Sequence, residues 1–351
     1  MLNYKGKKLL LIGYFSLDKL DSAPKVRTYN IHKGFCNIID TDFITGDRNS
    51  RKIPLLKYIF TGKIFDVDAI YVEAGPRTST EVDIFFLLFA KFIGKPIGLY
   101  IRDAYPLFKK DKKKNLKEII SDWGWFVSIW FYKFTASILF FPTEKLKKLF
   151  TGIKKYDLLP PAGKQIEYIP FSNDKKGILY CGALGFTYSP DILLKAVEKV
   201  YLENKDIELY FICREDELTQ ELKVMINNKP WIKVMHTDFE EIVKIREKIY
   251  LCMIPLSEST YSDLAIPVKT LDYMSIGRPI IATEKEELSN FFRENEIGLI
   301  CKTNIDDMAD KISFLLNNEK IAKEMSKNTH KVLLEKNLWE HRAKKVLSYL
   351  I

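Results

Sequence analysis

Short apolar runs alternate with amphipathic stretches along this chain, a pattern typical of parallel sheets whose strands are joined by helices. In the first half we predict strands at Lys8–Tyr14, Asn37–Ile39, Ala69–Val72, Ile97–Ile101 and Ser137–Phe141. Helices are expected at Ala23–Gly34 and Val82–Ile93. The first apolar run is short and is soon followed by Asp18 and Lys19, so we interpret it as a buried strand rather than a signal peptide.

The second half continues the same alternation. The predicted strands are Gly177–Tyr180, Glu208–Ile212, Ile232–Met235, Tyr250–Ile254, Pro279–Ala282 and Gly298–Ile300. The predicted helices are Pro190–Leu202, Glu217–Asn227, Phe239–Glu247, Pro267–Ser275, Glu286–Glu294 and Ile305–Asn317. Proline and glycine gather between Pro160 and Ser172, which indicates a boundary between two α/β domains. The tail, Asn337–Ile351, is expected to be an amphipathic helix.

Composition narrows the class of protein. A chain of 351 residues is long enough for two domains, and a content of 47% hydrophobic and 29% charged residues is typical of a globular protein. Five scattered cysteines without a C-x-x-C pair favour reduced thiols in a cytosolic setting, and no His/Cys cluster suggests a metal. The net charge is uneven: residues 1–172 carry +12 and the remaining residues −3, which predicts an anionic partner for the first half only.

The stretch Ile266–Thr283 carries the clearest chemical signal. Pro267 suits a first helical turn, and Gly277 suits a left-handed C-cap before a short strand. A helix N-terminus that carries Lys269 favours a phosphate, because exposed N–H groups, the helix dipole and an ammonium act together. Asp272, one turn on, could accept hydrogen bonds from a ribose diol. An ordinary αβ unit with surface charges would explain the same residues.

The same stretch, read as Pro-x-Lys-x-x-Asp/Glu-Tyr-Met-x-x-Gly-x-Pro-Ile-Ile-Ala-Thr, resembles the donor-site signature of family 4-like GT-B glycosyltransferases. Ile178–Leu184, Asp191–Val197 and Leu158–Gly163 resemble other parts of that family, and the likeness covers roughly residues 140–345. It implies two Rossmann-like α/β domains that face each other across a cleft. Residues 1–170 would bind the acceptor, 171–335 the nucleotide sugar, and the helix at 336–351 would return to the first domain.

The resemblance also implies an activity. Such an enzyme moves a sugar from a nucleotide-sugar donor, most simply a UDP- or GDP-sugar, to a glycan or lipid-linked acceptor in polysaccharide or cell-envelope biosynthesis. The resemblance further implies that the anomeric configuration of the sugar is retained and that the enzyme needs neither a cofactor nor a metal. Lys269 would bind the diphosphate, and Asp272 would bind the ribose. We also assign Lys269 a catalytic role.

The predicted phosphate loop departs from the family pattern. Gly182 follows a strand and would let a phosphate approach the backbone. Many family members carry an arginine and a lysine in this loop, but this chain has Ala183 and Tyr188 there. We therefore expect Lys269 and Arg214 to supply the positive charge, since Arg214 ends a strand and could bind a pyrophosphate.

The alternative for Arg214 is a solvated loop arginine paired with Glu215 or Asp216. In that case Arg214 would be a surface residue, and Lys269 alone would bind the diphosphate.

A second departure concerns the acid nearest the sugar. In the family pattern E-x7-E the second acid aligns with Asp272, and the first would fall on Leu264. Asp263 is adjacent, and Glu258 is the acid that we predict as a catalytic candidate. Tyr261 fits a subset of the family that has Pro-x-Lys before the helix, so we include it in the donor site.

In the first half, Asp103 follows a predicted strand directly and could orient or deprotonate an acceptor hydroxyl. An Asp that caps a local turn before Pro106 is the alternative. Glu73–Gly75 and the loop Leu17–Val26 also follow strands and could border the same acceptor site.

Residues 109–134 combine a lysine run, Lys109–Lys114, with the aromatic stretch Trp123–Phe134. This combination is typical of a membrane-surface element, and Lys133 argues against a full span. We expect a cytoplasmic protein, peripheral to the inner face of the cell membrane, that binds an anionic membrane surface through these residues. A buried helix under a solvated lysine loop is the alternative, and no nucleic-acid motif accompanies the stretch, so we expect no nucleic-acid partner.

Two other functions stay open. The missing loop cations and the missing first acid fit a catalytically silent GT-B partner subunit that docks an active glycosyltransferase at the membrane. A sugar-nucleotide epimerase of similar architecture would need paired carboxylates and a histidine, which we cannot place in this sequence.

Overall fold

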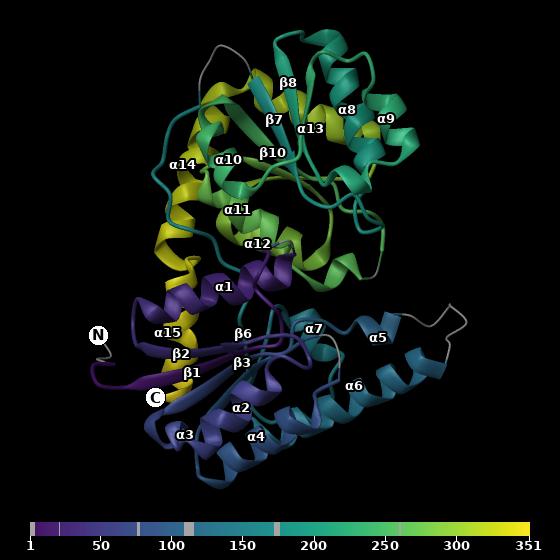
Figure 1. The fold of residues 1–351 in the computed structure, drawn as a ribbon. Helices are drawn as coiled ribbons and strands as arrows, with labels where there is room; N and C mark the ends of the chain where they lie inside the picture. Colours follow the sequence, from purple (N-terminus) through teal and green to yellow (C-terminus); the bar gives the residue numbers. More distant parts are fainter. Residues whose placement is uncertain (1–3, 21, 76–77, 109–115, 172–175, 260) are drawn as a thin grey trace. The chain divides into compact units, whose positions relative to one another are not determined.

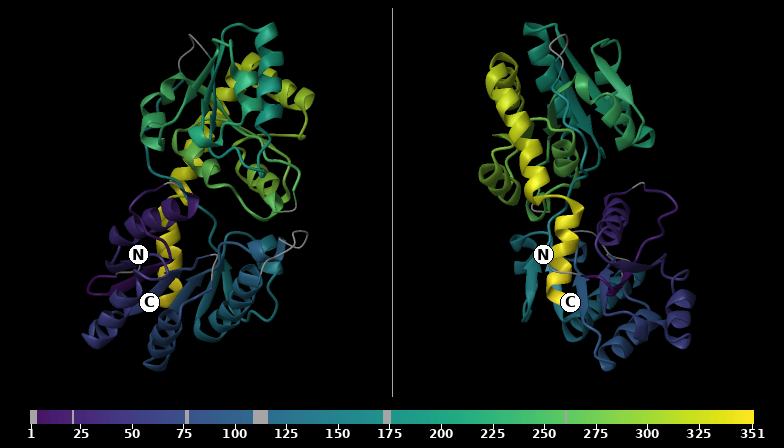
Figure 2. Two further views of the ribbon diagram at one scale, coloured as in Figure 1. Left: turned by 45° about the vertical axis from the view of Figure 1, so that its right-hand side comes forward. Right: turned by 90° about the vertical axis from the view of Figure 1, so that its left-hand side faces the viewer.

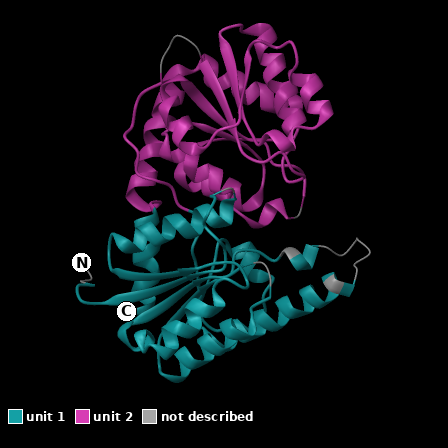
Figure 3. Ribbon diagram, viewed as in Figure 1, with its two compact units in different colours: residues 1–161, 339–351 teal, residues 162–338 magenta. Residues whose placement is uncertain are grey.

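The computed structural model describes residues 4–20, 22–75, 78–108, 116–171, 176–259 and 261–351 (Figure 1 and Figure 2). The chain divides into two compact units (Figure 3). Unit 1 comprises Met1–Pro161 and Trp339–Ile351, and unit 2 comprises Ala162–Leu338. The predicted lysine run at 109–114 lies outside the described residues.

Unit 1 is built on a six-stranded parallel sheet in the order β2-β1-β3-β4-β5-β6. The strands are β1 Lys8–Gly13, β2 Asp40–Thr45, β3 Ala69–Glu73, β4 Ile97–Tyr100, β5 Ile138–Phe141 and β6 Tyr156–Leu158. The helices are α1 Ala23–Cys36, α2 Lys52–Phe60, α3 Lys63–Asp66, α4 Glu81–Phe92, α5 Tyr105–Phe108, α6 Leu116–Thr135, α7 Glu144–Lys148 and α15 Trp339–Leu350. Helices cover both faces of this sheet, so the central strands are buried and almost wholly apolar.

Helix α15 closes one face of unit 1 although it follows unit 2 in the chain. It lies beside α1, and a Cβ at Gly34 would come within 2.9 Å of the Trp339 backbone. Leu350, near its end, lies 3.1 Å from the Cβ position of Gly98 on β4. The apolar side of the tail, with Val346 and Leu347 fully buried, therefore belongs to the core of unit 1.

Unit 2 contains a second six-stranded parallel sheet, in the order β12-β11-β10-β7-β8-β9. Its strands are β7 Lys176–Cys181, β8 Ile207–Ile212, β9 Ile232–Met235, β10 Ile249–Ile254, β11 Ile280–Thr283 and β12 Gly298–Cys301. Its α-helices are α8 Pro190–Glu203, α9 Gln220–Ile226, α10 Phe239–Lys244, α11 Val268–Ser275, α12 Glu286–Asn295, α13 Ile305–Asn317 and α14 Glu319–Lys336. The predicted class of two Rossmann-like α/β domains is confirmed.

The core of unit 2 has two layers because alternate residues of each strand point to opposite faces of the sheet. Ile178 and Tyr180 of β7 join the cluster under α8, α9 and α13. Leu179, between them, joins the cluster under α11, α12 and α14. Apolar side chains thus fill both faces of the sheet, which leaves the polar ends of the strands for binding a ligand.

Some local predictions were wrong. The strand expected at Asn37–Ile39 is β2, three residues later; its sequence is polar because it is an edge strand with only one buried residue. Pro267 does not lie inside α11 but is its N-cap, in an extended conformation with ψ of 139°. The helix expected at Phe239–Glu247 ends at Lys244 and continues as a separate 3₁₀ turn. Helices α2, α3, α5, α7 and α14 and strand β6 were not predicted.

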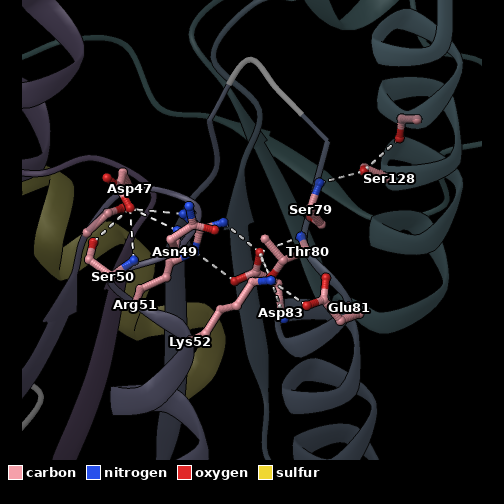
Figure 4. A network of polar contacts seen from close by, with 12 residues as sticks. Asp47, Asn49, Ser50, Arg51, Lys52, Ser79, Thr80, Glu81, Asp83 and Ser128 are labelled. Atoms are coloured by element: carbon pink, nitrogen blue, oxygen red, sulfur yellow. Dashed lines mark hydrogen bonds and ion pairs between the residues drawn. The ribbon is translucent and has the colours of Figure 1, made fainter. Parts of the chain in front are cut away.

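A buried ion pair ties α2 to α4 in unit 1 (Figure 4). Arg51 donates from Nε and Nη2 to the two carboxylate oxygens of Asp83, at 2.7 and 2.6 Å, and its guanidinium lies 4.0 Å from the Tyr14 ring centroid. Asp83 also accepts bonds from the backbone and hydroxyl of Thr80, which forms the capping box of α4. Both members of the pair are almost fully buried.

Arg51→Met should therefore lower the free energy of unfolding of unit 1 by about 3–5 kcal/mol, because it leaves the Asp83 carboxylate buried without its counter-charge. The matched control is Lys52→Met, which removes the neighbouring but exposed ion pair with Glu81 and should change stability by less than about 1 kcal/mol. Urea denaturation followed by tryptophan fluorescence measures both. Equal losses in the two variants would contradict this account.

Candidate functional site

The candidate site of unit 2 lies at the carboxyl ends of β7 and β10. The loop after β7, residues 182–189, pairs with the loop after β10 through a bridge between Tyr188 and Leu256. Ser257 extends this contact by donating from its backbone to Thr187 and from its hydroxyl to Phe186. The two loops thus form one continuous lining beside the N-terminus of α11.

Lys269 is the cation of this site. It lies in the first turn of α11, which contains no acidic residue, so the positive end of the helix dipole adds to its charge. Its Nζ is buried and has no hydrogen-bond partner among the described residues. A Cβ at Gly182 would lie 2.4 Å from this Nζ, so the ammonium lies directly against the backbone of the loop after β7. The structure thus brings together two residues that the sequence predicts for one phosphate site.

Gly182 is a glycine for two reasons. Its φ is +145°, a conformation that side chains rarely adopt, and any Cβ would collide with the Lys269 amine. Its backbone N–H is bonded to the carbonyl of Ile212 at 3.0 Å, which fixes the loop to β8.

Burial shifts the pKa values of both polar residues on this face of α11. It lowers the pKa of Lys269 to about 7, against the nearby Cys181, Asp272 and Glu217, which favour the charged form. Burial raises the pKa of Asp272 to about 7, against the positive charges of Lys164 and Lys269. Next to Asp272, Tyr273 accepts a hydrogen bond at 2.8 Å from the Cys181 backbone and so ties α11 to β7.

Arg214, which we predicted to supply positive charge for the diphosphate, is engaged with an acidic side chain. Its side chain is 56% exposed and forms an ion pair with Glu217, three residues later. The solvated alternative is therefore the better description, although its partner is Glu217 rather than Glu215 or Asp216. Sequence reasoning missed Glu217, whose carboxylate also accepts a hydrogen bond at 2.9 Å from the Leu184 backbone. The run of three acids after a strand end was the available signal.

The other predicted donor-site residues lie on the loop after β10. Glu258 is exposed and directly follows Ser257. Tyr261 lies near enough to Tyr188 to contribute to the raised pKa of that phenol, behind burial and Cys181. Asp263, the acid beside the expected position, is 3.9 Å from Lys285 and so is engaged in an ion pair.

Asp103 belongs to unit 1, at the carboxyl end of β4. The Arg102 Nη2 lies 3.4 Å from its Oδ2, and the Arg102 guanidinium lies 4.8 Å from the Phe15 ring centroid. Arg102 and Asp103 line, together with Gly75, a cavity of about 10 Å³, enough for one water. Glu73, predicted to border this site, is instead buried and bound through both oxygens by the Arg27 Nε at 3.1 Å.

Within the described part of the chain, no three His, Cys, Asp or Glu side chains gather where they could hold a metal ion. A cavity of about 560 Å³ lies between α12, β12 and α14, and none of the predicted site residues lines it.

The sequence of residues 163–332 matches the family described as glycosyl transferases group 1. The match spans nearly all of unit 2. A curated relative, an uncharacterised glycosyltransferase of Methanocaldococcus jannaschii, is 26% identical over 167 residues, which are 46% of this chain. The match spans 44% of that relative, so less than half of its length is shared.

Solved structures share the fold over nearly the whole chain. Sucrose-phosphate synthase from Thermosynechococcus elongatus has a TM-score of 0.66 at 11% identity, covering 97% of this chain and 98% of its own. HepE from Anabaena, solved in complex with UDP, has a TM-score of 0.70 at 12% identity, covering 98% of this chain and 99% of its own. At such identities the likeness shows the fold.

Lys269→Met should stabilise unit 2 in a pH-dependent way. Because the folded-state pKa of Lys269 is about 7 and its ordinary value is 10.5, the unfolded chain binds more protons between these values. The penalty for burying the ammonium is therefore full below pH 7 and disappears as the pH rises toward 10.5. We expect a gain of about 1–2 kcal/mol at pH 6 that shrinks by pH 10.

Thermal unfolding at pH 6, 8 and 10 measures this gain. Lys195→Met, an exposed lysine of α8, is the matched control and should show no such trend. A loss of stability in Lys269→Met that is the same at every pH would contradict the buried, unpaired ammonium.

Proposed function

We propose that this protein is a glycosyltransferase that moves a sugar from a nucleotide-sugar donor, bound in unit 2, to a glycan or lipid-linked acceptor. The observation that carries the proposal is the Lys269 ammonium, buried without a hydrogen-bond partner among the described residues and set against Gly182. A buried cation with no counter-ion at a helix N-terminus is a site that awaits an anion. HepE, which has the same fold, was solved with UDP.

In this proposal Lys269 and the N-terminus of α11 bind the diphosphate of the donor. As the bond to the sugar breaks, negative charge grows on the departing diphosphate, and an ammonium already fixed in place stabilises that charge without reorganisation. Gly182 allows the phosphate oxygens to approach the loop backbone. The charge is supplied by protein groups, which supports a metal-independent reaction and, with the family resemblance, retention of configuration.

Asp272 would bind the ribose hydroxyls. It lies one turn beyond Lys269, and the arriving nucleotide brings hydrogen-bond donors to a carboxyl whose pKa burial has raised to about 7. Tyr261 and Glu258, on the loop that pairs with the glycine loop, would lie nearer the sugar. Asp103 would orient the acceptor hydroxyl in unit 1, with Arg102 holding its carboxylate.

The second part of the proposal is attachment to an anionic membrane surface through unit 1. Eight apolar residues of α6 recur every three or four positions, and all are between 36% and 72% exposed: Leu116, Ile119, Ile120, Trp123, Phe126, Val127, Trp130 and Phe134. We call them the apolar face of α6. An apolar stripe that faces water, rich in tryptophan and phenylalanine, suits the headgroup zone of a bilayer.

The neighbouring helix enlarges this surface. Phe85, Leu88 and Phe92 of α4 are also exposed, and the Lys91 ammonium lies 3.7 Å from the Phe134 ring centroid of α6. Figure 1 shows α4 and α6 side by side on the same face of the unit 1 sheet. Lysines at the border of an aromatic surface attract anionic lipid, which supports a place at the cytoplasmic face of the membrane and a lipid-linked acceptor.

No helix in the described ranges is long and apolar enough to cross a membrane.

A catalytically silent partner subunit is the second candidate. It is favoured by Glu217, which holds both Arg214 and the Leu184 N–H, two groups that could otherwise face a diphosphate. The two candidates differ in nucleotide binding, which the next experiment measures.

Among UDP, GDP, ADP and CMP, we expect UDP or GDP to raise the thermal unfolding temperature of the protein. At a ligand concentration of about 100 Kd the gain is about 2.7 kcal/mol, or several degrees. Lys269→Ala should abolish the shift, whereas Lys195→Ala should keep it. No shift with any nucleotide in the wild-type protein would favour the silent partner subunit.

Vesicles of phosphatidylcholine with phosphatidylglycerol should bind the wild-type protein, and replacing both Trp123 and Trp130 by Asp should weaken that binding at least about tenfold. Leu202→Asp is the control, because Leu202 is equally exposed, at 68%, but lies in unit 2. Co-sedimentation and the blue shift of tryptophan fluorescence report binding. Equal losses in both variants, or none in either, would contradict the membrane assignment.

A further inference from the structure

Aromatic rings, rather than carboxylates, surround the Lys269 ammonium. Its Nζ lies 3.7 Å from the ring centroid of Tyr188 and 4.4 Å from that of Tyr180. The third neighbour is the backbone of Gly182, and Nζ has no hydrogen-bond partner among the described residues. The ring faces are therefore the attractive contacts that the structure gives this charge at close range.

The backbone fixes the Tyr188 ring in this place. Tyr188 donates its backbone N–H to Gly185 at 2.9 Å and forms the bridge to Leu256, and the next residue, Ser189, donates to Pro255 at 2.8 Å. Both sides of Tyr188 are thus held by the loop after β10. The ring then meets Tyr180 edge-on, with 6.4 Å between centroids and an angle of 76°.

Tyr180 provides the second ring beside the Lys269 ammonium. Its hydroxyl donates to the Ala183 carbonyl, and its ring stacks on Phe211 of β8 with 5.2 Å between centroids. Because Tyr180 is part of β7 and fully buried, it cannot move away from Lys269. The loop residue Tyr188 is the one whose replacement leaves the sheet intact.

The face of an aromatic ring can attract an ammonium in place of a hydrogen-bonding or ion-pair partner. The quadrupole of an aromatic ring attracts an ammonium without neutralising it, and the attraction is strongest when the pair is withdrawn from water. A carboxylate in the same place would hold the lysine equally well but would compete with an incoming phosphate. The rings thus favour the charged form of Lys269, fix its position and leave its charge for the ligand.

We propose that Tyr188 is a positioning residue of the donor site, whose ring face holds the Lys269 ammonium against Gly182 so that it meets the diphosphate of a sugar nucleotide. The proposal rests on the proposed function of unit 2. It assigns a role to the residue that stands where the family resemblance expects a basic side chain. The diphosphate then meets one ammonium fixed by two rings.

One consequence is a simple pH dependence. Burial places the pKa of Lys269 at about 7, with Cys181, Asp272 and Glu217 opposing that shift. The titratable groups that face it from other elements are the phenols of Tyr180 and Tyr188, the Cys181 thiol of β7 and the Glu217 carboxylate. Binding of a diphosphate, which favours the protonated amine, should be strongest below this pKa and should weaken as the pH rises above it.

Two substitutions separate the ring face from the rest of the side chain. Tyr188→Phe keeps the ring and removes the hydroxyl, whereas Tyr188→Leu keeps an apolar group and removes the ring. Tyr201→Leu is the matched control, since Tyr201 lies 4.2 Å from the Lys205 ammonium and stacks on Trp231, at the far end of α8. Thermal unfolding and circular dichroism check that each variant folds.

The first measurement needs no ligand. The Lys269 pKa is read from the ¹³Cε shift of labelled lysine, with the resonance assigned by its absence in Lys269→Arg. We expect Tyr188→Leu to lower this pKa by about one unit, and Tyr188→Phe and Tyr201→Leu to leave it in place. An unchanged pKa in Tyr188→Leu overturns the proposal, whatever the protein binds.

The second measurement is the affinity for UDP-glucose, whose diphosphate does not titrate near neutral pH, by calorimetry at pH 6.5, 7.5 and 8.5. Tyr188→Leu should weaken binding about tenfold at pH 7.5 and should move the loss of binding to lower pH, while Tyr188→Phe restores the wild-type profile. Weak binding in Tyr188→Phe as well would overturn the role of the ring face. If the pKa responds as expected but the wild type binds no nucleotide, the proposed function fails and the diphosphate assignment fails with it.

Discussion

Each sheet of this protein is buried on both faces, and that constraint decides where chemistry can take place. Parallel strands covered by helices on two sides leave no room for polar side chains along their length. In unit 2 the residues of β7 and β10 are apolar until the strands end, and the polar groups follow at once. Gly182, Lys269 and Asp272 therefore meet at the carboxyl edge of the sheet, which is where ligands of such folds bind.

The buried charges of the described residues differ in how they are satisfied. Arg51 and Asp83 of unit 1 are paired through two hydrogen bonds, and the carboxylate also caps α4. Arg27 and Glu73 are paired in the same unit. The Lys269 ammonium of unit 2 is buried, and among the described residues it has no hydrogen-bond partner. The paired charges hold elements together, whereas in the proposed function the unpaired Lys269 ammonium keeps its electrostatic free energy for the donor diphosphate.

The sequence predicts unit 2 more accurately than unit 1 for a physical reason. Its strands are mostly apolar, with polar side chains mainly near their ends, so each was placed within two residues. In unit 1 the edge strand β2 is polar and was displaced, because only Ile44 of its six residues is buried. The motif around Lys269 could be predicted because the start of the helix at Pro267, the cation Lys269 and the capping glycine Gly277 follow one another in the chain.

Other parts of the site depend on contacts that no local pattern encodes. Glu217 holds Arg214 through a three-residue spacing that the sequence contains, but its bond to the Leu184 backbone joins two separate loops. The Tyr188 ring reaches Lys269 only because its loop pairs with the loop after β10. A tyrosine at a position where a basic residue is expected looks like a loss until the fold shows that it faces the lysine of another element.

The path of the chain also affects when each unit can become complete. Residues 162–338 form unit 2 by themselves, whereas unit 1 requires α15, whose residues follow them. During synthesis on the ribosome, unit 2 can therefore assemble as soon as its own residues have emerged. Unit 1 begins first and finishes last, and the faces of α1 and β4 that α15 covers stay open until then. A chaperone that binds apolar surface would find its target in unit 1 throughout that interval.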